Sequence, residues 1–311
     1  MTTLYVTHPS FLDHDTGWGH PERADRLRAI EKAFSHEIFA PLVREEAPTA
    51  DDAAIARVHP QAYIDAIRAA APQSGSVHVD GDTVMSPGTL KALYHGVGAA
   101  IRATDAVMTG EVRNAFCGIR PPGHHAEPEQ AMGFCFFNNA AIAGQHARAV
   151  HGAERVAVVD FDVHHGNGTQ AAFWGDRNLF YASTHEMPLY PGSGHISETG
   201  VAGNIVNAPL RAGDAGEAFR EAFRARVLPA LANFGPDLLI ISAGFDAHRD
   251  DPLANICLVE DDFAWVTNEL AEIAQKHAQG RIVSLLEGGY NLTALARSAA
   301  VHLSVLMHVG R

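Results

Sequence analysis

The sequence contains a stretch, DFDVHHGNG, in which carboxylates alternate with an imidazole. It supplies Asp160, Asp162 and His164, and residues two apart on an extended strand project to the same side. A carboxylate and an imidazole that share a side can chelate one divalent cation. A lone Asp-x-His pair is about as often a strand-end cap beside a core histidine, so the interpretation depends on further ligands.

A third ligand is available from Asp246 in SAGFDAH, where a second apolar run ends. Two carboxylates and one imidazole, with one position left open for water, are typical of a catalytic zinc site rather than a closed structural one. The motifs therefore predict a catalytic metal centre.

Two adjacent histidines, His124 and His125, lie on a Pro-Gly turn in RPPGHHAE. An exposed loop pair is the simpler interpretation, but beside a metal motif we expect a tandem acid–base pair in which each ring faces its own acceptor. Asp160 and Asn167 are the candidates. A carboxylate behind His124 would favour its charged form, whereas an amide behind His125 would leave that ring to titrate nearer neutrality. His125 is then the group that takes the proton from the metal-activated water.

A third motif, EGGY, ends in Tyr290. Gly288 and Gly289 allow backbone conformations that other residues avoid, so the tyrosine can turn over a crevice. Its phenol would stabilise the oxyanion of a tetrahedral intermediate. Taken alone, Tyr290 would be interpreted as a core residue after a flexible turn. Together, the three motifs predict zinc-assisted hydrolysis of an amide.

These residues need a scaffold that brings distant loops together. Apolar runs without polar alternation predict strands covered on both faces, as in a parallel sheet, and Ala-rich stretches between them have helical spacing. We expect one α/β domain over residues 1–311, with helices on both faces of the sheet. The polar motifs follow the carboxyl ends of four strands, where ligands bind in such sheets. The expected strands are 3–8, 116–120, 155–165, 179–184, 204–210, 237–248 and 281–290, and the expected helices are 89–108, 139–151, 215–233, 260–277 and 292–307.

Composition excludes several classes of protein. The chain has 311 residues, of which 47% are hydrophobic, and Asp and Glu outnumber Lys and Arg by 36 to 23, a net charge of −13. Without a basic run, direct binding of nucleic acid is not expected. No signal peptide and no apolar run of about 20 residues is present, so we expect no membrane partner and a cytoplasmic location. Three scattered cysteines do not form a disulfide framework or a Cys-rich zinc site.

Six motifs together resemble the histone deacetylase superfamily, which includes acetylpolyamine amidohydrolases and bacterial deacetylase-like proteins. The match covers roughly residues 18–293, in the order of the family. Two features are similar to the class II branch: Asn167, where class I members carry Asp, and the sequence FCFFNN. The motifs are PPGHHAE, MGFCFFNNAAIA, VDFDVHHGNGTQ, YPGSG, SAGFDAHRDDPL and LLEGGY.

The resemblance implies the arginase–deacetylase fold, a single domain with a central eight-stranded parallel sheet flanked by helices. It places one zinc ion on Asp162, His164 and Asp246. It also makes His124 and His125 the tandem pair, with His125 as general base, and Tyr290 the group that polarises the substrate carbonyl.

The resemblance further implies an acyl-lysine tunnel and a structural potassium ion. Phe134 and Tyr190 correspond to the aromatic tunnel walls, and Gly133 lets an alkyl chain pass close to the backbone. The potassium ligands are the side chain and carbonyl of Asp160, the Ser183 hydroxyl, and the carbonyls of Asp162, His164 and Thr184.

Substrate choice is inferred from the rim of the tunnel. Polyamine-selective relatives carry Glu after the Asp-Pro of the DDP loop, where this chain has Leu253, which favours acyl-lysine or another amide with an apolar stem over an acetylpolyamine. Asp82 is either a rim carboxylate that holds the substrate backbone or a turn residue.

Two alternative functions remain. The first is a ureohydrolase, which would need a second metal ion, but His165 and Asn167 occupy the positions where that ion would require Asp. The second is a non-catalytic binder of acyl-lysine, which would not require the histidine pair and Tyr290. Bacterial relatives are often dimers or tetramers, so a homo-oligomer is also expected.

Overall fold

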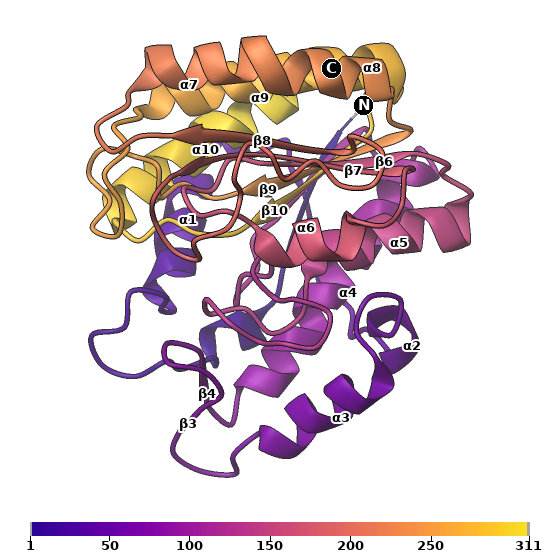
Figure 1. The fold of residues 1–311 in the computed structure, drawn as a ribbon. Helices are drawn as coiled ribbons and strands as arrows, with labels where there is room; N and C mark the ends of the chain where they lie inside the picture. Colours follow the sequence, from indigo (N-terminus) through magenta and orange to yellow (C-terminus); the bar gives the residue numbers. More distant parts are fainter. Residues whose placement is uncertain (1, 310–311) are drawn as a thin grey trace.

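The computed structural model describes residues 2–309, and its centre is an eight-stranded sheet in which every pairing is parallel (Figure 1). The strand order is β2-β1-β5-β10-β9-β6-β7-β8. This confirms the predicted fold class. The strands are β1 (Thr3–Thr7), β2 (Val43–Glu46), β5 (Asn114–Cys117), β6 (Val156–Asp160), β7 (Leu179–Glu186), β8 (Ile205–Leu210), β9 (Leu238–Ala243) and β10 (Ile282–Leu286).

Helices cover both faces of the sheet (Figure 1). One layer contains α1 (Asp25–Phe34), α9 (Glu260–His277) and α10 (Leu292–Val309), with α10 packed on both of the others, and α7 (Gly216–Ala222) and α8 (Leu228–Phe234) pack on α9. The opposite layer contains α4 (Thr89–Met108), α5 (Asn139–His151) and α6 (Asn167–Phe173). Beyond that layer lie α2 (Asp52–Ile55), α3 (Gln61–Ala70) and the hairpin of β3 (Val77–His78) and β4 (Val84–Met85).

The central strands explain why the sheet is covered on both sides. All residues of β6 and of β9 are buried, and neither strand alternates apolar with polar side chains as a half-exposed strand would. The strands are shorter than the predicted runs at their carboxyl ends. The runs predicted at 155–165, 237–248 and 281–290 leave the sheet after Asp160, Ala243 and Leu286, and their polar ends form loops at one edge.

Three of the five predicted helices, at 89–108, 139–151 and 260–277, have the predicted bounds, and α10 extends two residues further. The stretch predicted to be helical at 215–233 is helical over 216–234, although it is not a regular α-helix throughout. A π-helical turn at Phe223–Val227 separates α7 from α8. Pro229 is the second residue of α8 and has no N–H to donate, so the hydrogen-bond ladder must shift in the turn before it.

Strand β2 and helices α1, α3 and α6 were not predicted. β2 is an edge strand of sequence VREE, with no buried residue, so it has no apolar signal. Among the described helices, α10 is long and apolar enough in composition to cross a membrane. It buries Leu295, Leu303 and Leu306 and packs on α1 and α9, as a core helix does. The three cysteines, all within the described part of the chain, are unpaired.

Replacement of Phe116 tests how much the packing against the sheet contributes to the free energy of unfolding. Its side chain is fully buried, with ring centroids 6.1 Å from Tyr5, 6.0 Å from Phe34 and 5.6 Å from His302. We expect Phe116→Ala to lower the free energy of unfolding by about 3–5 kcal/mol, because it leaves a cavity the sheet cannot close. Urea unfolding measures this. The control Trp18→Ala, at a fully exposed side chain, should change it by less than about 0.5 kcal/mol, and equal losses in both variants would contradict the packing argument.

Candidate active site

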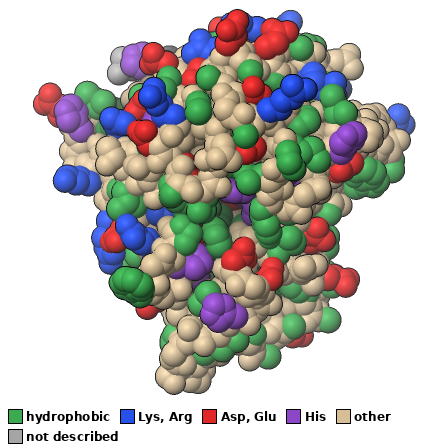
Figure 2. All heavy atoms as spheres, turned by 60° about the vertical axis from the view of Figure 1, so that its left-hand side comes forward, with side chains coloured by type: hydrophobic (Ala, Val, Ile, Leu, Met, Phe, Trp, Pro, Cys, Tyr) green, Lys and Arg blue, Asp and Glu red, His purple; other side chains and the backbone are tan. Residues whose placement is uncertain are grey.

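A narrow pocket lies at the sheet edge where the parallel strands end. Its volume is about 210 Å³, below the roughly 300–1,000 Å³ of sites for drug-sized ligands, so it suits a slender chain. Figure 2 shows a face that is hollowed near its centre, where histidine side chains lie deep between hydrophobic ones. The pocket contains the five residues predicted to form the tunnel and three predicted to do chemistry. Its lining residues are Asp82, His125, Gly133, Phe134, His164, Leu189, Tyr190, Leu253 and Tyr290.

Asp162, His164 and Asp246 converge at the base of this pocket. The Nδ1 atom of His164 lies 3.1 Å from Oδ1 of Asp162 and 3.1 Å from Oδ2 of Asp246. All three side chains are buried, and one ligand atom from each lies within 4.8 Å of the others. The group therefore fits a divalent cation by donor type and spacing. It includes the Asp162–His164 pair expected from the Asp-x-His spacing, together with Asp246.

Backbone amides hold the two carboxylates in place. The N–H groups of His164 and Gly288 donate to Asp162 at 2.9 and 2.8 Å, and that of Val163 donates to Asp246 at 2.9 Å. A Cβ at Gly288 would overlap Asp246, so this position requires glycine for close approach rather than for backbone freedom. Gly289, by contrast, has a φ of +120°. The EGG sequence thus supports the metal ligands as well as Tyr290.

The charge of this cluster is unbalanced without a cation. Burial disfavours the charged form of His164, but the carboxylates of Asp162 and Asp246 outweigh it and raise the pKa of the ring to about 10. A proton on His164 therefore takes the place that a metal ion would occupy. Two buried carboxylates that hold an imidazole in its charged form are a site suited to a divalent ion.

Both contacts expected of the histidine pair are present. His124 Nδ1 lies 2.9 Å from Oδ2 of Asp160, and His125 Nδ1 lies 2.9 Å from Oδ1 of Asn167. Burial opposes the charging of His124, yet Asp160 and Asp162 raise its pKa well above the ordinary value. Burial and then the neighbouring His124 lower the pKa of His125 well below it. The surroundings therefore favour the charged form of His124 and the neutral form of His125.

The orientation of Asn167 follows from its second hydrogen bond. Its amide Nδ2 donates to Oε1 of Glu127 at 2.8 Å, so its carbonyl oxygen faces His125. His125 then carries its proton on Nδ1, and its Nε2 has a free lone pair. His125 lines the pocket, so this lone pair is available to a bound molecule.

Tyr290 is positioned by a hydrogen bond from its backbone N–H and by a buried arginine beside its ring. Its N–H donates to Oδ2 of Asp251 at 2.7 Å, and the guanidinium of Arg26 lies 5.0 Å from its ring centroid. Arg26 also donates to the carbonyls of Glu287 and Gly289. Burial, followed by the Asp246 carboxylate, raises the pKa of Tyr290 well above 10. The phenol stays protonated and can donate a hydrogen bond.

The supporting residues Glu22, Arg26, Arg120 and Asp251 were not assigned a role from the sequence. Arg120 makes a bidentate pair with Glu22, at 2.5 and 2.8 Å, and Arg26 donates to the same carboxylate at 3.1 Å; all three side chains are fully buried. Burial raises the pKa of Glu22, but Arg120 and His14 outweigh it and hold it well below the ordinary value. The signal available was the i,i+4 spacing of Glu22 and Arg26, which is typical of an exposed helix pair.

The tunnel walls depend on two residues with left-handed backbone. Gly133 has a φ of +56° and Phe134 a φ of +68°, and a Cβ at Gly133 would overlap the His125 ring. Tyr190 also lines the pocket, with its ring 5.1 Å from that of His125. Leu253 and the partly buried Asp82 also line the pocket. The backbone carbonyl of Asp82 accepts from His20 at 3.2 Å.

The predicted potassium ligands lie at the ends of β6 and β7. Asp160 and Ser183 are register partners, and both are fully buried. Ser183 Oγ lies 2.9 Å from His185 Nδ1. The hydroxyl of Thr184 is buried and has no hydrogen-bond partner among the described residues. This part of the structure gathers hard oxygen atoms, the donor type that potassium prefers.

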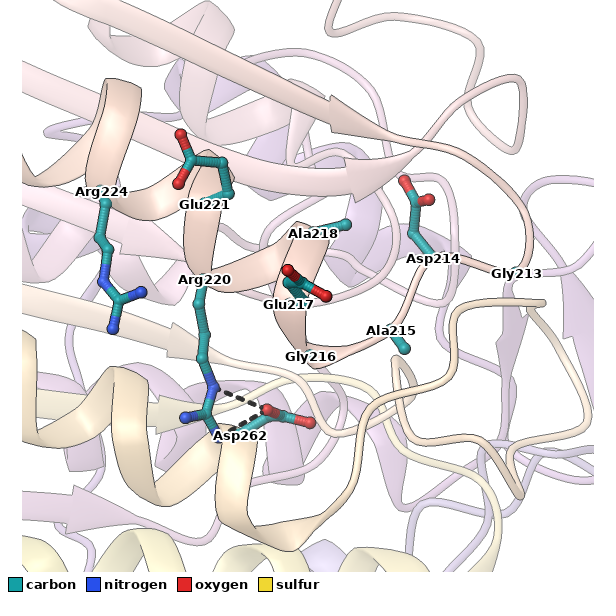
Figure 3. A pocket seen from close by; sticks show the side chains of 10 residues that line it. All are labelled: Gly213, Asp214, Ala215, Gly216, Glu217, Ala218, Arg220, Glu221, Arg224 and Asp262. Atoms are coloured by element: carbon teal, nitrogen blue, oxygen red, sulfur yellow. Dashed lines mark hydrogen bonds and ion pairs between the residues drawn. The ribbon is translucent and has the colours of Figure 1, made fainter.

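An open pocket beside the start of α7 is separate from this site (Figure 3). It includes an ion pair between Arg220 and Asp262 at 2.9 Å and other charged side chains. None of the residues predicted to do chemistry lines it.

The pKa of His164 predicts how metal affinity depends on pH. Below about pH 10 the metal-free ring is protonated, so a cation must displace that proton to bind. We expect the apparent affinity for a divalent ion to rise by about tenfold per pH unit between pH 6 and 8. Competition with a chelator across this range measures it. An affinity that does not change with pH would contradict the competition between proton and metal.

Comparison with known proteins agrees with the fold and identifies the family. Residues 20–306 match the family model described as the histone deacetylase domain. A histone deacetylase-like amidohydrolase of Pseudomonas aeruginosa is 41% identical over 278 residues, which are 88% of this chain and 73% of that protein. A probable deacetylase of Archaeoglobus fulgidus is 36% identical over 324 residues, covering 98% of this chain and 89% of its own.

The crystal structure of the HDA15 HD domain superposes with a TM-score of 0.93 at 34% identity, covering 99% of this chain and 88% of that one. The predicted superfamily and the arginase–deacetylase fold are therefore confirmed. The chain belongs to the histone deacetylase family of deacetylases and amidohydrolases.

Proposed function

We propose that this chain is a zinc-dependent amidohydrolase that removes acetyl or other acyl groups from an acylated lysine-like amine. One observation carries the proposal. One narrow pocket is lined by His164, which belongs to a group that could hold a metal ion, by His125, whose surroundings favour the neutral ring, and by Tyr290, whose surroundings favour the protonated phenol. This is the set of groups that amide hydrolysis needs: a Lewis acid, a base and an oxyanion donor.

The residues fit two cations in different ways. Asp162, His164 and Asp246 would hold zinc, which when bound polarises a carbonyl group and lowers the pKa of water. The side chain of Asp160 and the Ser183 hydroxyl, with the carbonyls of Asp162, His164 and Thr184, would hold a structural potassium ion. Potassium there would add positive charge behind the histidine pair.

His125 acts as the general base in this proposal. Its Nε2 accepts a proton from the attacking water, since Asn167 occupies Nδ1. As the C–N bond breaks, His125 returns that proton to the leaving nitrogen, so the products are a carboxylic acid and a free amine. His124 stays charged through Asp160 and supplies positive charge beside the reacting carbonyl.

Tyr290 stabilises the negative charge that develops on the carbonyl oxygen. Asp251 holds its backbone and Arg26 lies over its ring, so the side chain needs little reorganisation to donate a hydrogen bond. Phe134, with its ring 5.9 Å from that of Tyr290, lines the same pocket.

The rim favours acyl-lysine over an acetylpolyamine. Leu253 lines the pocket where polyamine-selective relatives carry Glu, and it would pack against an alkyl stem rather than pair with a second amine. Asp82 lines the same pocket and could accept from the substrate backbone. The net charge of −13 favours cationic substrates of either class and does not distinguish between them. The expectations of a homo-oligomer and of a cytoplasmic location stay predictions.

Neither alternative is supported by the contacts. His165, which a ureohydrolase would replace with a second-metal ligand, has both ring nitrogens engaged, by Ser193 at 2.8 Å and Gln170 at 3.0 Å. A binder of acylated ligands would not require a base and an oxyanion donor in one pocket.

Acetate release from an acetyl-lysine peptide tests the function. We expect turnover by the zinc-loaded wild type, and a loss of about 10²–10³-fold in kcat for Tyr290→Phe with zinc still bound, because only a transition-state hydrogen bond is removed. His125→Ala should also retain zinc and lose turnover. Elemental analysis confirms the zinc content of each variant.

Two results would count against the proposal. Equal inactivity of wild type and His125→Ala with zinc loaded would favour the non-catalytic binder. Full activity of Tyr290→Phe would remove the oxyanion role from Tyr290.

Leu253→Glu tests the assignment of substrate class. A carboxylate at this rim position should pair with the distal amine of an acetylpolyamine, so we expect the ratio of kcat/KM for acetylpolyamine to that for acetyl-lysine peptide to rise by at least about tenfold. Leu253→Gln, which has a similar size and no charge, is the matched control. An equal change in both variants would show that size, not charge, sets the preference.

A further inference from the structure

A second group of metal-ligating side chains lies outside the pocket. Asp105 on α4 faces His146 and His151 on α5. Its Oδ1 lies 2.7 Å from Nε2 of His146 and 2.6 Å from Nε2 of His151. One ligand atom from each residue lies within 4.8 Å of the others. No step of the proposed reaction uses these residues.

The cluster lies at the sheet edge opposite to the pocket. Helix α4 ends at Met108 and leads into β5, and α5 ends at His151 and leads into β6. Both helices therefore finish at the edge where the parallel strands begin. The C-terminal end of a helix carries negative partial charge. Two such ends and the Asp105 carboxylate together favour a cation at this place.

The donor set indicates which cation. Two imidazoles and one carboxylate, with a position open to water, suit zinc among the common biological ions and do not suit magnesium or calcium, which prefer oxygen. The side chains of His146 and His151 are mostly buried, whereas that of Asp105 is 39% exposed, so an ion and its water ligand have access from the Asp105 side.

Small movements would open the cluster for zinc. Ligand atoms around a tetrahedral zinc ion lie about 3.3 Å apart when each bond is about 2.0 Å, so Asp105 must withdraw by about half an ångström. Its side chain is partly exposed and can rotate, and its Oδ2 makes no hydrogen bond with the described residues. The Nδ1 atom of His146 is buried and likewise has no partner within residues 2–309, so this ring acts through Nε2 alone.

We propose that Asp105, His146 and His151 bind one zinc ion that joins the C-terminal ends of α4 and α5. The alternative is a metal-free contact in which Asp105 accepts hydrogen bonds from both rings and holds the helices together. The proposal also changes how metal counts are interpreted. Two zinc ions per chain would then be expected of an enzyme with a one-metal catalytic centre.

Zinc content in matched variants tests the proposal. His151→Gln removes a ligand while its amide can still donate to Asp105, so the hydrogen-bonded contact is kept. The double variant His146→Ala/His151→Ala removes both rings, and His308→Ala removes an exposed histidine elsewhere on the surface. After equilibrium dialysis against zinc, we expect about two ions per chain in wild type and His308→Ala, and about one in the other two variants, by elemental analysis.

Thermal unfolding of His151→Gln provides a second readout. In excess chelator, wild type and His151→Gln should unfold at similar temperatures, and added zinc should raise the unfolding temperature of wild type further than that of the variant. The zinc at the pocket contributes to both proteins, so the difference between them reports the second site. Acetate release should be equal in wild type and His151→Gln, which separates this test from that of the proposed function.

Equal zinc content in wild type and His151→Gln would overturn the proposal and assign the cluster to the metal-free contact. So would an equal rise in unfolding temperature with zinc. If the double variant does not fold, His151→Gln alone still decides, because it preserves side-chain volume and hydrogen bonding.

Discussion

The active-site architecture depends on one constraint: several carboxylates are buried together and each must be compensated. Asp160, Asp162 and Asp246 are fully removed from solvent at the same edge of the sheet. A buried carboxylate without partners would be strongly destabilising or would take up a proton. The structure compensates them with backbone N–H groups, with His124 and His164, and with room for a cation. The same interactions set the protonation states that the chemistry requires.

Glu22 is another buried carboxylate, and its charge is compensated by protein groups alone. Arg120 and Arg26 both donate to it, and Arg26 continues to the carbonyls of Glu287 and Gly289, directly before Tyr290. Removing Glu22 would leave two buried guanidinium groups unpaired, which usually costs more than the net gain of the pair itself. The ion-pair network therefore positions the loop that carries Tyr290, the proposed oxyanion donor.

The sequence predicted the parts whose chemistry is local. Alternation in DFDVHH, the adjacent histidines and EGGY indicated ligands, a base and a donor, and buried strands without alternation indicated the parallel sheet. Contacts that depend on distant segments could not be predicted in this way. Arg26 meets Gly289 across 263 residues of chain, and a fully buried arginine contradicts the usual preference of that residue. Edge strand β2 has no buried side chain, so burial left no pattern to detect.

The parallel sheet also sorts charge between its two edges. At the edge where strands end, helices begin, and α6 starts at Asn167 beside the Asp160–His124 pair. The positive N-terminal end of a helix favours buried carboxylates there. At the other edge helices end, and their negative ends favour cations, as at the C-terminal ends of α4 and α5. Because every strand runs the same way, this polarity is common to all the crossovers. The buried carboxylates of the pocket can therefore gather at the edge where helices begin, while the opposite edge favours a cation, as proposed at Asp105, His146 and His151.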